Sequence, residues 1–252
     1  MIPGTPRYSL IIPAYNEEAY LPRLLDTVDR ARERYRAGAG AIEVIVADNA
    51  STDGTARIAH ARGCRVMAVG KRVIGAARNG GARAARGEIL AFIDADSQIH
   101  PETFNEIDRI LAGGDVIGGT TGVRFERRSP GLACTYALLV VLALTLRGGR
   151  GIEDLNLDTG VVFCRRCDFE AIGGYSETRL FAEDVQLLFD LRRLGWKRGQ
   201  RLTRGTKAQA VFSTRKFDQY GDWHYFTMPL RLAWNLLRGR DDLARRYWYE
   251  GR

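Results

Sequence analysis

The amino-acid sequence predicts an α/β protein with a mostly parallel central sheet flanked by helices. Short, continuously apolar runs alternate with helix-like patterns over roughly the first hundred residues, which is typical of a doubly wound parallel sheet. The runs are followed by polar clusters, as expected where strands end at a ligand-binding edge. With 252 residues, of which 45% are hydrophobic, the chain can bury one sizeable core.

The first half of the chain supplies four apolar runs and two clear helices between them. The predicted strands are Tyr8–Ile12, Ile42–Ala47, Cys64–Val69 and Ile89–Ile93. One helix follows the first strand, with Leu21, Leu24, Leu25 and Val28 at helical spacing and Gly38 and Gly40 at its end. The other is Ile74–Ala85, whose many alanines and glycines allow close approach to its neighbours.

The second half is less regular. A helix is expected from Pro101 to about Leu111, and another over Glu183–Leu194 with Val185, Leu188 and Leu191 facing inward. The expected strands are Val116–Phe125, Gly160–Cys164 and Ala208–Phe212, and Gly173-Gly174-Tyr175 is expected to form a turn. A short amphipathic helix is predicted over Pro229–Leu237.

An apolar stretch of 15 residues, Leu132–Leu146, lies between Arg127-Arg128 and Arg147. It is shorter than the ~20 residues that span a bilayer. Two interpretations remain open: a buried or oligomer-facing helix, consistent with a homodimer, and a helix that touches a membrane surface.

The net charge of +8 is concentrated near the C-terminus. Residues 192–252 contain 15 Lys/Arg and 5 Asp/Glu, whereas the other 191 residues contain 23 and 25. We therefore expect a main domain over 1–215 and a basic, aromatic, helical appendage over 216–252. Such a segment favours peripheral contact with an anionic membrane, although a solvated arginine-rich surface fits it equally well.

The cysteines and the N-terminus indicate a cytoplasmic protein, and a location at the inner face of the membrane is left open. Cys164 and Cys167 form a single C-x-x-C without a second pair, so a structural zinc site is not expected. We expect all four cysteines to be reduced core residues. No signal peptide is apparent before the first strand, and no run of 18 apolar residues occurs.

Two carboxylates, Asp94 and Asp96, directly follow the apolar run Ile89–Ile93. Because side chains alternate along an extended chain, the two should point the same way. A hard divalent cation that holds a diphosphate would stabilise such a pair. The alternative is a polar loop in which Ser97 caps the next helix.

Further polar groups are expected at the same edge. Glu17 follows the first strand and Asp48 the second, and either can accept hydrogen bonds from a base or a ribose. Arg78 and Asn79 can add donors. Glu17 and Asp53 can instead match helix N-terminal charge, and Arg78 can form a surface salt bridge. Neither a G-x-G-x-x-G nor a P-loop sequence occurs, which disfavours dinucleotide-binding and P-loop enzymes.

Five ordered motifs resemble those of family 2 glycosyltransferases, which have the GT-A fold. They are Pro13-Ala14-Tyr15-Asn16-Glu17, Asp48-Asn49-Ala50-Ser51-Thr52-Asp53-Gly54-Thr55, Gly75-x-x-Arg78-Asn79, Asp94-Ala95-Asp96 and Glu183-Asp184. The resemblance covers roughly residues 8–200 and implies a nucleotide-sugar-binding half, 8–100, and an acceptor-binding half, 101–215.

The resemblance also implies roles for individual residues. Asp96, with Asp94, would hold Mg²⁺ or Mn²⁺, and Asp184 would be the general base with Glu183 beside it. The nucleotide sugar would be bound by Pro13, Ala14, Tyr15, Glu17, Asp48, Asn49, Arg78, Asn79, Asp94 and Ala95. Arg215 and Lys216 are candidates for the diphosphate, and His224 is a weaker candidate for the metal. We expect the helix dipole to favour ionised Asp184.

The predicted function is transfer of one sugar from a UDP- or GDP-sugar to an acceptor hydroxyl, with inversion implied by the resemblance. Gly195-Trp196-Lys197-Arg198 stands where processive relatives have Q-x-x-R-W, which favours single addition. We expect a lipid-linked acceptor, as in cell-envelope or glycolipid synthesis, and no nucleic-acid partner. The alternatives are a sugar-phosphate nucleotidyltransferase, which the acidic loop after the first strand disfavours, and a catalytically silent nucleotide-sugar-binding scaffold.

Overall fold

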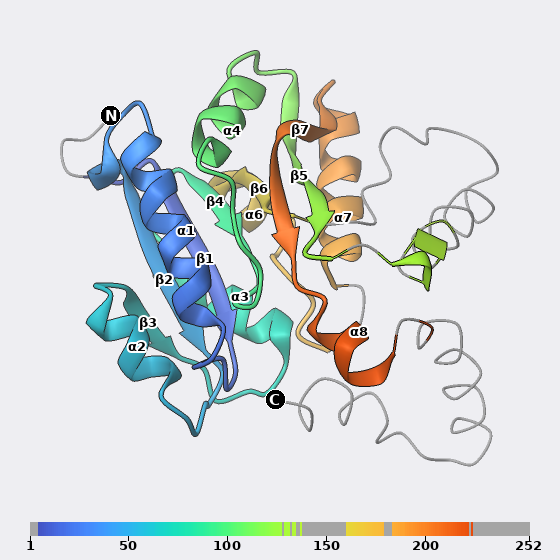
Figure 1. Cartoon of the computed structure of the whole chain (residues 1–252). Helices are drawn as coiled ribbons and strands as arrows, with labels where there is room; N and C mark the ends of the chain where they lie inside the picture. The colour runs from blue at the N-terminus through green and yellow to red at the C-terminus, as the bar shows by residue number, and fades with distance from the viewer. Residues whose placement is uncertain are drawn as a thin grey trace.

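The computed structural model of the chain describes residues 5–127, 129–131, 133–134, 137, 160–178, 183–221 and 223. Its centre is a seven-stranded sheet with the order β3-β2-β1-β4-β6-β5-β7 (Figure 1). The strands are β1 (Tyr8–Ala14), β2 (Ile42–Asp48), β3 (Arg65–Ala68), β4 (Ile89–Phe92), β5 (Val116–Phe125), β6 (Val162–Arg165) and β7 (Arg201–Phe212). Only β6 is antiparallel to its neighbours β4 and β5, so the predicted mostly parallel sheet is confirmed.

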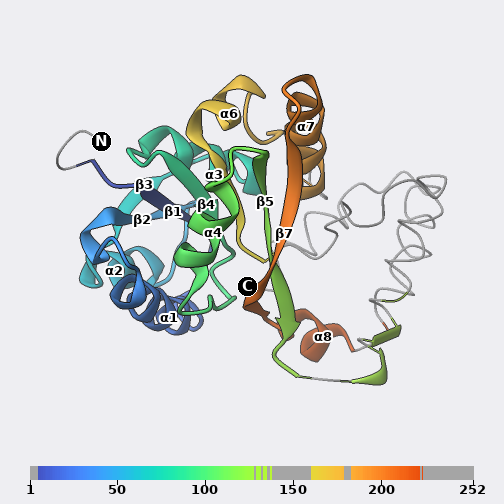
Figure 2. The same cartoon turned by 90° about the horizontal axis from the view of Figure 1, so that it is seen from above.

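Helices cover both faces of the sheet. They are α1 (Leu21–Arg34), α2 (Thr55–Ala61), α3 (Ile74–Ala84), α4 (Thr103–Leu111), α6 (Arg166–Ala171), α7 (Glu183–Lys197) and α8 (Arg215–Tyr220), with a short 3-10 turn, η1 (Ala39–Ala41). Seen from above, α1, α2 and α4 lie on one side of the sheet and α3, α6 and α7 on the other (Figure 2). The result is a three-layer α/β/α arrangement.

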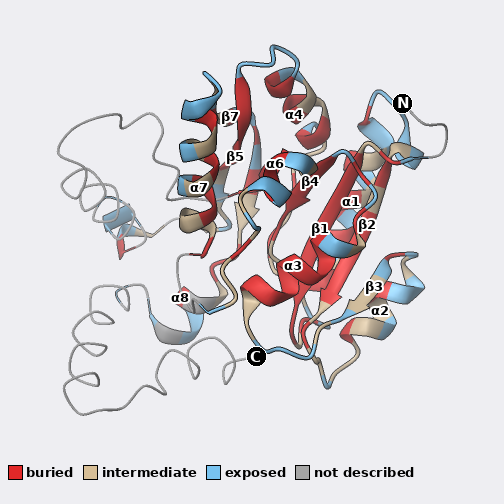
Figure 3. Cartoon of the chain, turned by 180° about the vertical axis from the view of Figure 1, so that it is seen from behind, coloured by how far each residue is buried: buried red, intermediate tan, exposed pale blue. Residues whose placement is uncertain are grey.

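The two faces of the sheet form two separate apolar cores. Leu10 and Ile12 of β1 face α1 and α4, whereas Ile11 between them faces the core with α3 and α7. Because both faces are covered, β1 and β4 are buried along their whole length, which explains their continuous apolar runs. The buried face of α3 is visible beside β1 in Figure 3.

Most predicted elements are present, and the differences are informative. β7 is 12 residues long, although only Ala208–Phe212 was predicted, because its first part is a partly exposed edge strand with polar residues. The short helix α6 was not predicted. In α7, Leu187 is buried and Val185 only half-buried, so the predicted inward face is partly wrong. Most of 132–146 and all of Pro229–Leu237 lie outside the described residues.

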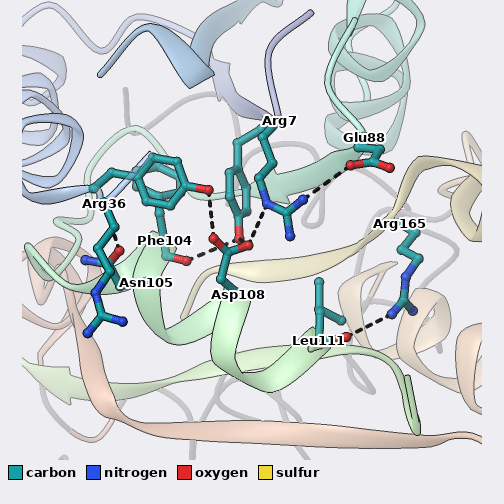
Figure 4. A network of polar contacts seen from close by, with 10 residues as sticks. Arg7, Arg36, Glu88, Phe104, Asn105, Asp108, Leu111 and Arg165 are labelled. Carbon is teal, nitrogen blue, oxygen red and sulfur yellow. Dashed lines mark hydrogen bonds and ion pairs between the residues drawn. The ribbon is translucent and has the colours of Figure 1, made fainter. Parts of the chain in front are cut away.

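A polar network closes the amino-terminal edge of the sheet. Asp108 of α4 accepts hydrogen bonds from the Tyr8 hydroxyl at 2.9 Å, the Tyr35 hydroxyl at 2.7 Å and Arg7 Nε at 2.7 Å. Figure 4 shows Arg7 reaching Asp108 and also Glu88. Burial and the neighbouring Asp108 carboxylate raise the pKa of both tyrosines. One carboxylate with three donors therefore joins β1, α1 and α4.

All four cysteines are free, but only two lie in the core. Cys64 and Cys164 are buried, and burial raises the pKa of the Cys64 thiol to about 11. Cys134 and Cys167 are exposed, so the prediction of four core cysteines is wrong for these two. Within the part of the chain that the structure describes, none of the helices combines the length and apolarity needed to cross a bilayer.

Candidate functional site

The loops after β1 and β2 hold each other at the carboxyl edge of the sheet. Asn16 N donates to Ser51 Oγ at 3.0 Å, and Thr52 N donates to Asn16 Oδ1 at 2.9 Å. Asn16 and Ala50 have φ values of 52° and 63°, and among the described residues no other non-glycine has a positive φ. Backbone held in this region clusters at functional sites, so the two outliers point to this edge.

Arg78 of α3 binds three carboxylates at this edge. Its Nη2 donates to Asp94 Oδ1 at 2.8 Å, and its Nη1 donates to Glu183 Oε1 at 2.7 Å. Nη1 also lies 3.0 Å from Asp184 Oδ1. Arg78 is only 3% exposed. The alternative of a surface salt bridge for Arg78 is therefore wrong, because its guanidinium is the buried centre of the carboxylate cluster.

Within this cluster, the pKa of Asp184 is raised. Burial raises the pKa of Asp184 to about 7, and the nearby Glu183 and Asp94 carboxylates act in the same direction. Arg78 and the hydrogen bond from Tyr175 lower this pKa but do not outweigh burial. Burial thus opposes the effect expected of the helix dipole, which favours the ionised form of Asp184. A carboxyl group that titrates near neutral pH is well suited to general-base work.

Glu183 and Asp184 differ in their access to solvent. The Glu183 side chain is 6% exposed, whereas that of Asp184 is 18% exposed. Both begin α7, whose next turns are anchored in the core through Leu187, Leu188 and Leu191. Asp184 is therefore the member of the pair that can reach a substrate, and Glu183 supports Arg78.

Tyr175 supports the same cluster and was not predicted from the sequence. Its hydroxyl donates to Asp184 Oδ1 at 3.0 Å, and its ring lies 5.1 Å from the Arg78 guanidinium carbon. Asn79 fixes the tyrosine, since its Oδ1 accepts from Tyr175 N and its Nδ2 donates to Tyr175 O. A signal existed in the Gly173-Gly174-Tyr175 turn, where both glycines have positive φ.

Close packing of α3 makes this arrangement possible. A Cβ at Gly75 would lie 2.2 Å from the carbonyl oxygen of Ser176, and one at Gly81 would lie 2.4 Å from Ile11. Only glycine permits these approaches, so the Gly75-x-x-Arg78-Asn79 motif brings Arg78 and Asn79 against the chain that leads to α7.

A second arginine pairs with the carboxylates at the tips of β1 and β4. Arg215 donates from Nη1 to Glu17 Oε2 at 2.9 Å and from Nη2 to Glu17 Oε1 at 3.0 Å. Its Nη2 is also 3.1 Å from Asp96 Oδ2. The isolated bridge between Gln98 and Val211 brings the end of β7 beside the loop after β4, which explains how residues so far apart in sequence meet.

The remaining residues predicted to bind the nucleotide sugar lie at or beside the tips of β1, β2 and β4. Asp48 Oδ1 accepts from Ser51 N at 3.2 Å, and the Tyr15 ring lies 5.1 Å from the Arg72 guanidinium carbon. The Asn49 side-chain amide donates to the carbonyls of Val69 and Lys71, so it braces the chain after β3. Pro13 and Ala14 end β1, and Ala95 is buried between the two aspartates.

The carboxylate oxygens after β4 are suited to a hard cation that takes few ligands from the protein. Asp94 and Asp96 offer carboxylate oxygens, and Mg²⁺ is commonly held by one or two carboxylates together with substrate phosphates. The described residues contain no cluster of three or more His, Cys, Asp or Glu that would form a complete metal site by themselves. His224 lies outside the described residues, as does the Lys216 side chain.

An open cleft of about 660 Å³ adjoins Arg215. Its lining comes from the loops after β1 and β2 and from α8: Asn16, Glu18, Ala19, Tyr20, Asp53, Arg215, Asp218 and Gln219. The carboxyl edge is therefore hollowed next to the Glu17–Arg215–Asp96 group.

The solved structures that share this three-layer fold belong to one class of proteins, the glycosyltransferases of GT-A fold. TarS 1–349 of S. aureus is 19% identical, with a TM-score of 0.62 over 83% of this chain and 61% of that chain. The mannosyltransferase PcManGT from Pyrobaculum calidifontis, crystallised with GDP-Man and Mn²⁺, is 22% identical, with a TM-score of 0.60 over 82% of this chain and 57% of that chain. The predicted GT-A fold is confirmed.

The sequence comparison identifies the family. The model of glycosyl transferase family 2 matches residues 9–146, more than half of the chain. The chain belongs to glycosyl transferase family 2, as its motifs predicted.

Two curated relatives show how far the similarity extends. An undecaprenyl-phosphate 4-deoxy-4-formamido-L-arabinose transferase of Pseudomonas paraeruginosa is 34% identical over 154 residues, 58% of this chain and 44% of that protein. The validoxylamine A glucosyltransferase of Streptomyces hygroscopicus subsp. limoneus is 34% identical over 115 residues, 43% of this chain and 24% of that protein. The matched region spans less than half the length of either relative.

Proposed function

We propose that this chain is a metal-dependent, inverting glycosyltransferase that adds a single sugar from a UDP- or GDP-sugar to an acceptor. One observation carries the proposal: the Arg78 guanidinium holds Asp94 on one side and Asp184 on the other, at 2.8 and 3.0 Å. Asp94, the carboxylate expected on the diphosphate side, and Asp184, the candidate base, are thus separated by a single planar guanidinium. This spacing suits a reaction at the sugar carbon next to the diphosphate.

The chain's own residues account for the steps. Asp94 and Asp96 would hold Mg²⁺ or Mn²⁺, which neutralises charge on the departing diphosphate when bound. Asp184 would take the proton of an acceptor hydroxyl, and its pKa of about 7 leaves a large ionised fraction at neutral pH. Glu183 and Tyr175 would keep Asp184 and Arg78 in place.

The test is release of nucleoside diphosphate. The protein is incubated with UDP-glucose, UDP-N-acetylglucosamine or GDP-mannose and Mn²⁺, with an alkyl glycoside or a polyprenyl phosphate as acceptor. With the alkyl glycoside as acceptor, release that is lost in both Asp96→Ala and Asp184→Ala supports the proposal. Pyrophosphate release from UTP or GTP with a sugar 1-phosphate would instead identify a nucleotidyltransferase. Nucleotide-sugar binding without turnover would identify a silent scaffold.

We further propose a lipid-linked acceptor at an anionic membrane surface. The basic C-terminal quarter of the chain supports this proposal, because residues 192–252 carry a threefold excess of Lys/Arg over Asp/Glu. The undecaprenyl-phosphate transferase relative supports it independently through the acceptor in its name. Sedimentation of the full chain with phosphatidylglycerol vesicles, compared with phosphatidylcholine vesicles, tests it. Equal recovery in the two supernatants would favour a soluble acceptor.

A further inference from the structure

Glu17 lies at the tip of β1, yet its carboxylate faces the protein. It is 1% exposed, and both of its carboxylate oxygens accept hydrogen bonds from Arg215. A base or a ribose could reach these oxygens only by displacing the arginine. This geometry does not fit the expectation that Glu17 binds the nucleoside directly.

The surroundings of Glu17 hold it rigidly. Its backbone N donates to Thr55 Oγ1 at 2.8 Å, and its carbonyl oxygen accepts from Tyr20 N at 3.0 Å. The Tyr20 ring in turn lies 4.5 Å from the Arg215 guanidinium carbon. Glu17 therefore fixes Arg215 from two sides, through its own carboxylate and through Tyr20.

Arg215 lies next to the place where the donor diphosphate is expected. Its Nη2 lies 3.1 Å from Asp96 Oδ2, the carboxylate proposed for the divalent cation. Once Asp96 binds a cation, the two hydrogen bonds to Glu17 can still keep Arg215 at the edge. A guanidinium has five N–H donors, so the fork that Glu17 holds can also present donors to phosphate oxygens.

We propose that Glu17 is a positioning residue that holds Arg215 against the donor diphosphate, and that it does not contact the nucleoside. This inference rests on the proposed function, because it assumes a nucleoside-diphosphate donor at the edge. It gives the strand-tip carboxylates different partners: Asp94 and Asp96 serve the cation, and Glu17 serves the arginine. Arg215, the first residue of α8, thereby becomes part of the donor site.

The experiment compares ligands that differ only in their phosphates. Binding of UDP and uridine, and of GDP and guanosine, is measured with Mn²⁺ by calorimetry or ligand-observed NMR. Variants are Glu17→Gln, Glu17→Asp and Arg215→Gln. Glu17→Gln and Arg215→Gln should lower diphosphate affinity about tenfold or more while nucleoside affinity stays within about twofold, since only the charge-assisted phosphate contacts are lost.

Two further readouts separate positioning from general structural damage. The double variant Glu17→Gln/Arg215→Gln should bind UDP or GDP no more weakly than Arg215→Gln alone, because the two residues act through one contact. Glu17→Asp keeps the charge and should retain more diphosphate affinity than Glu17→Gln. If Glu17→Gln does not fold, the Glu17→Asp variant provides the measurement. It should show a loss of affinity for the diphosphate and no loss of affinity for the nucleoside.

The results that would contradict the positioning role differ from those that would contradict the proposed function. Equal loss of nucleoside and diphosphate affinity in the Glu17 variants, or unchanged diphosphate affinity in Arg215→Gln, would overturn the positioning role and leave the proposed function standing. Failure of the wild-type chain to bind UDP, GDP or their sugars would overturn the proposed function itself.

Discussion

The two edges of the sheet use the same chemical groups in opposite proportions. At the amino edge, Asp108 receives three donors, from Arg7, Tyr8 and Tyr35. Figure 4 shows the contact between Arg7 and Asp108. At the carboxyl edge, the single guanidinium of Arg78 is shared by three carboxylates, Asp94, Glu183 and Asp184. Around Asp108 the donors outnumber the carboxylate, whereas around Arg78 the carboxylates outnumber the guanidinium.

This difference separates a structural network from a binding site. A buried charge with enough hydrogen-bond partners ties elements together and asks for no ligand. A cluster with excess negative charge is costly in the free protein, and a cation or a proton relieves the cost. Burial raises the pKa of Asp184, and the neighbouring Glu183 and Asp94 carboxylates act in the same direction. The following predictions test the contrast, from the largest expected effect to the smallest.

Replacing the candidate base should have the largest effect. Asp184→Asn should lower kcat about 10²- to 10⁴-fold with a hydroxyl acceptor, because the acceptor proton then has no base. With a polyprenyl phosphate acceptor, the loss should be much smaller, because that group is already ionised near neutral pH. Steady-state kinetics with both acceptors measure the contrast. Asp108→Asn is the matched control, and an equal loss of kcat there would erase the distinction between the edges.

Removing the central arginine should destabilise the carboxyl edge strongly. Arg78→Met leaves three carboxylates without their shared cation and should lower the free energy of unfolding by about 3–5 kcal/mol at neutral pH. The loss should shrink at acidic pH as the carboxylates take up protons. Arg7→Met is the control and should cost about 1 kcal/mol, since Arg7 is partly exposed and Asp108 keeps two tyrosine donors. Urea unfolding at two pH values provides both numbers, and equal losses for the two variants would contradict the comparison.

The amino-edge network should affect stability without affecting catalysis. Asp108→Asn weakens three hydrogen bonds and should lower the free energy of unfolding by about 1–3 kcal/mol. Its kcat per folded molecule should match that of the wild-type chain, because Asp108 lies at the opposite edge. Thermal unfolding and turnover are measured on the same preparation. A kcat that falls while the unfolding transition is unmoved would show that the amino edge takes part in the reaction.

The pH dependence provides a finer test. If ionised Asp184 is the base, kcat/KM should rise about tenfold per pH unit below a pKa of about 7 and then level off. The contribution of Asp184 to the free energy of unfolding changes with pH in the opposite direction. Because the pKa of Asp184 in the folded protein is raised above 3.8, this contribution is present at low pH and is lost as pH rises through about 7. Asp184→Asn should remove both effects. A flat profile from pH 5 to 8 would assign the proton transfer to another group.

The helices and strands could largely be read from local sequence. Apolar runs such as Ile89–Phe92 are unambiguous because a strand buried on both faces has no polar positions. The first part of β7 was missed because an edge strand tolerates polar residues, so Arg201–Lys207 carries no apolar run. Helix α6 was missed because six residues with few apolar positions show no clear periodicity.

The candidate site was only partly predictable, and the limits are physical. Asp94, Asp96 and Asp184 could be selected as candidates, because carboxylates after strands or at helix starts are visible in the sequence. Tyr175 was missed because its link to Asp184 depends on how α3 and α7 pack. The pairing of Glu17 with Arg215 was not predicted, because nothing in the sequence links two residues that lie 198 positions apart.

By itself, the sequence determined the mostly parallel α/β fold, the family and the set of acidic groups at the strand ends, since these depend on local hydrophobicity and ordered motifs. Tertiary structure alone decided which cation each carboxylate faces: Arg78 for Asp94, Glu183 and Asp184, and Arg215 for Glu17 and Asp96. The reason is that electrostatic partners are chosen by distance and burial in the packed protein, and neither quantity is encoded in local pattern.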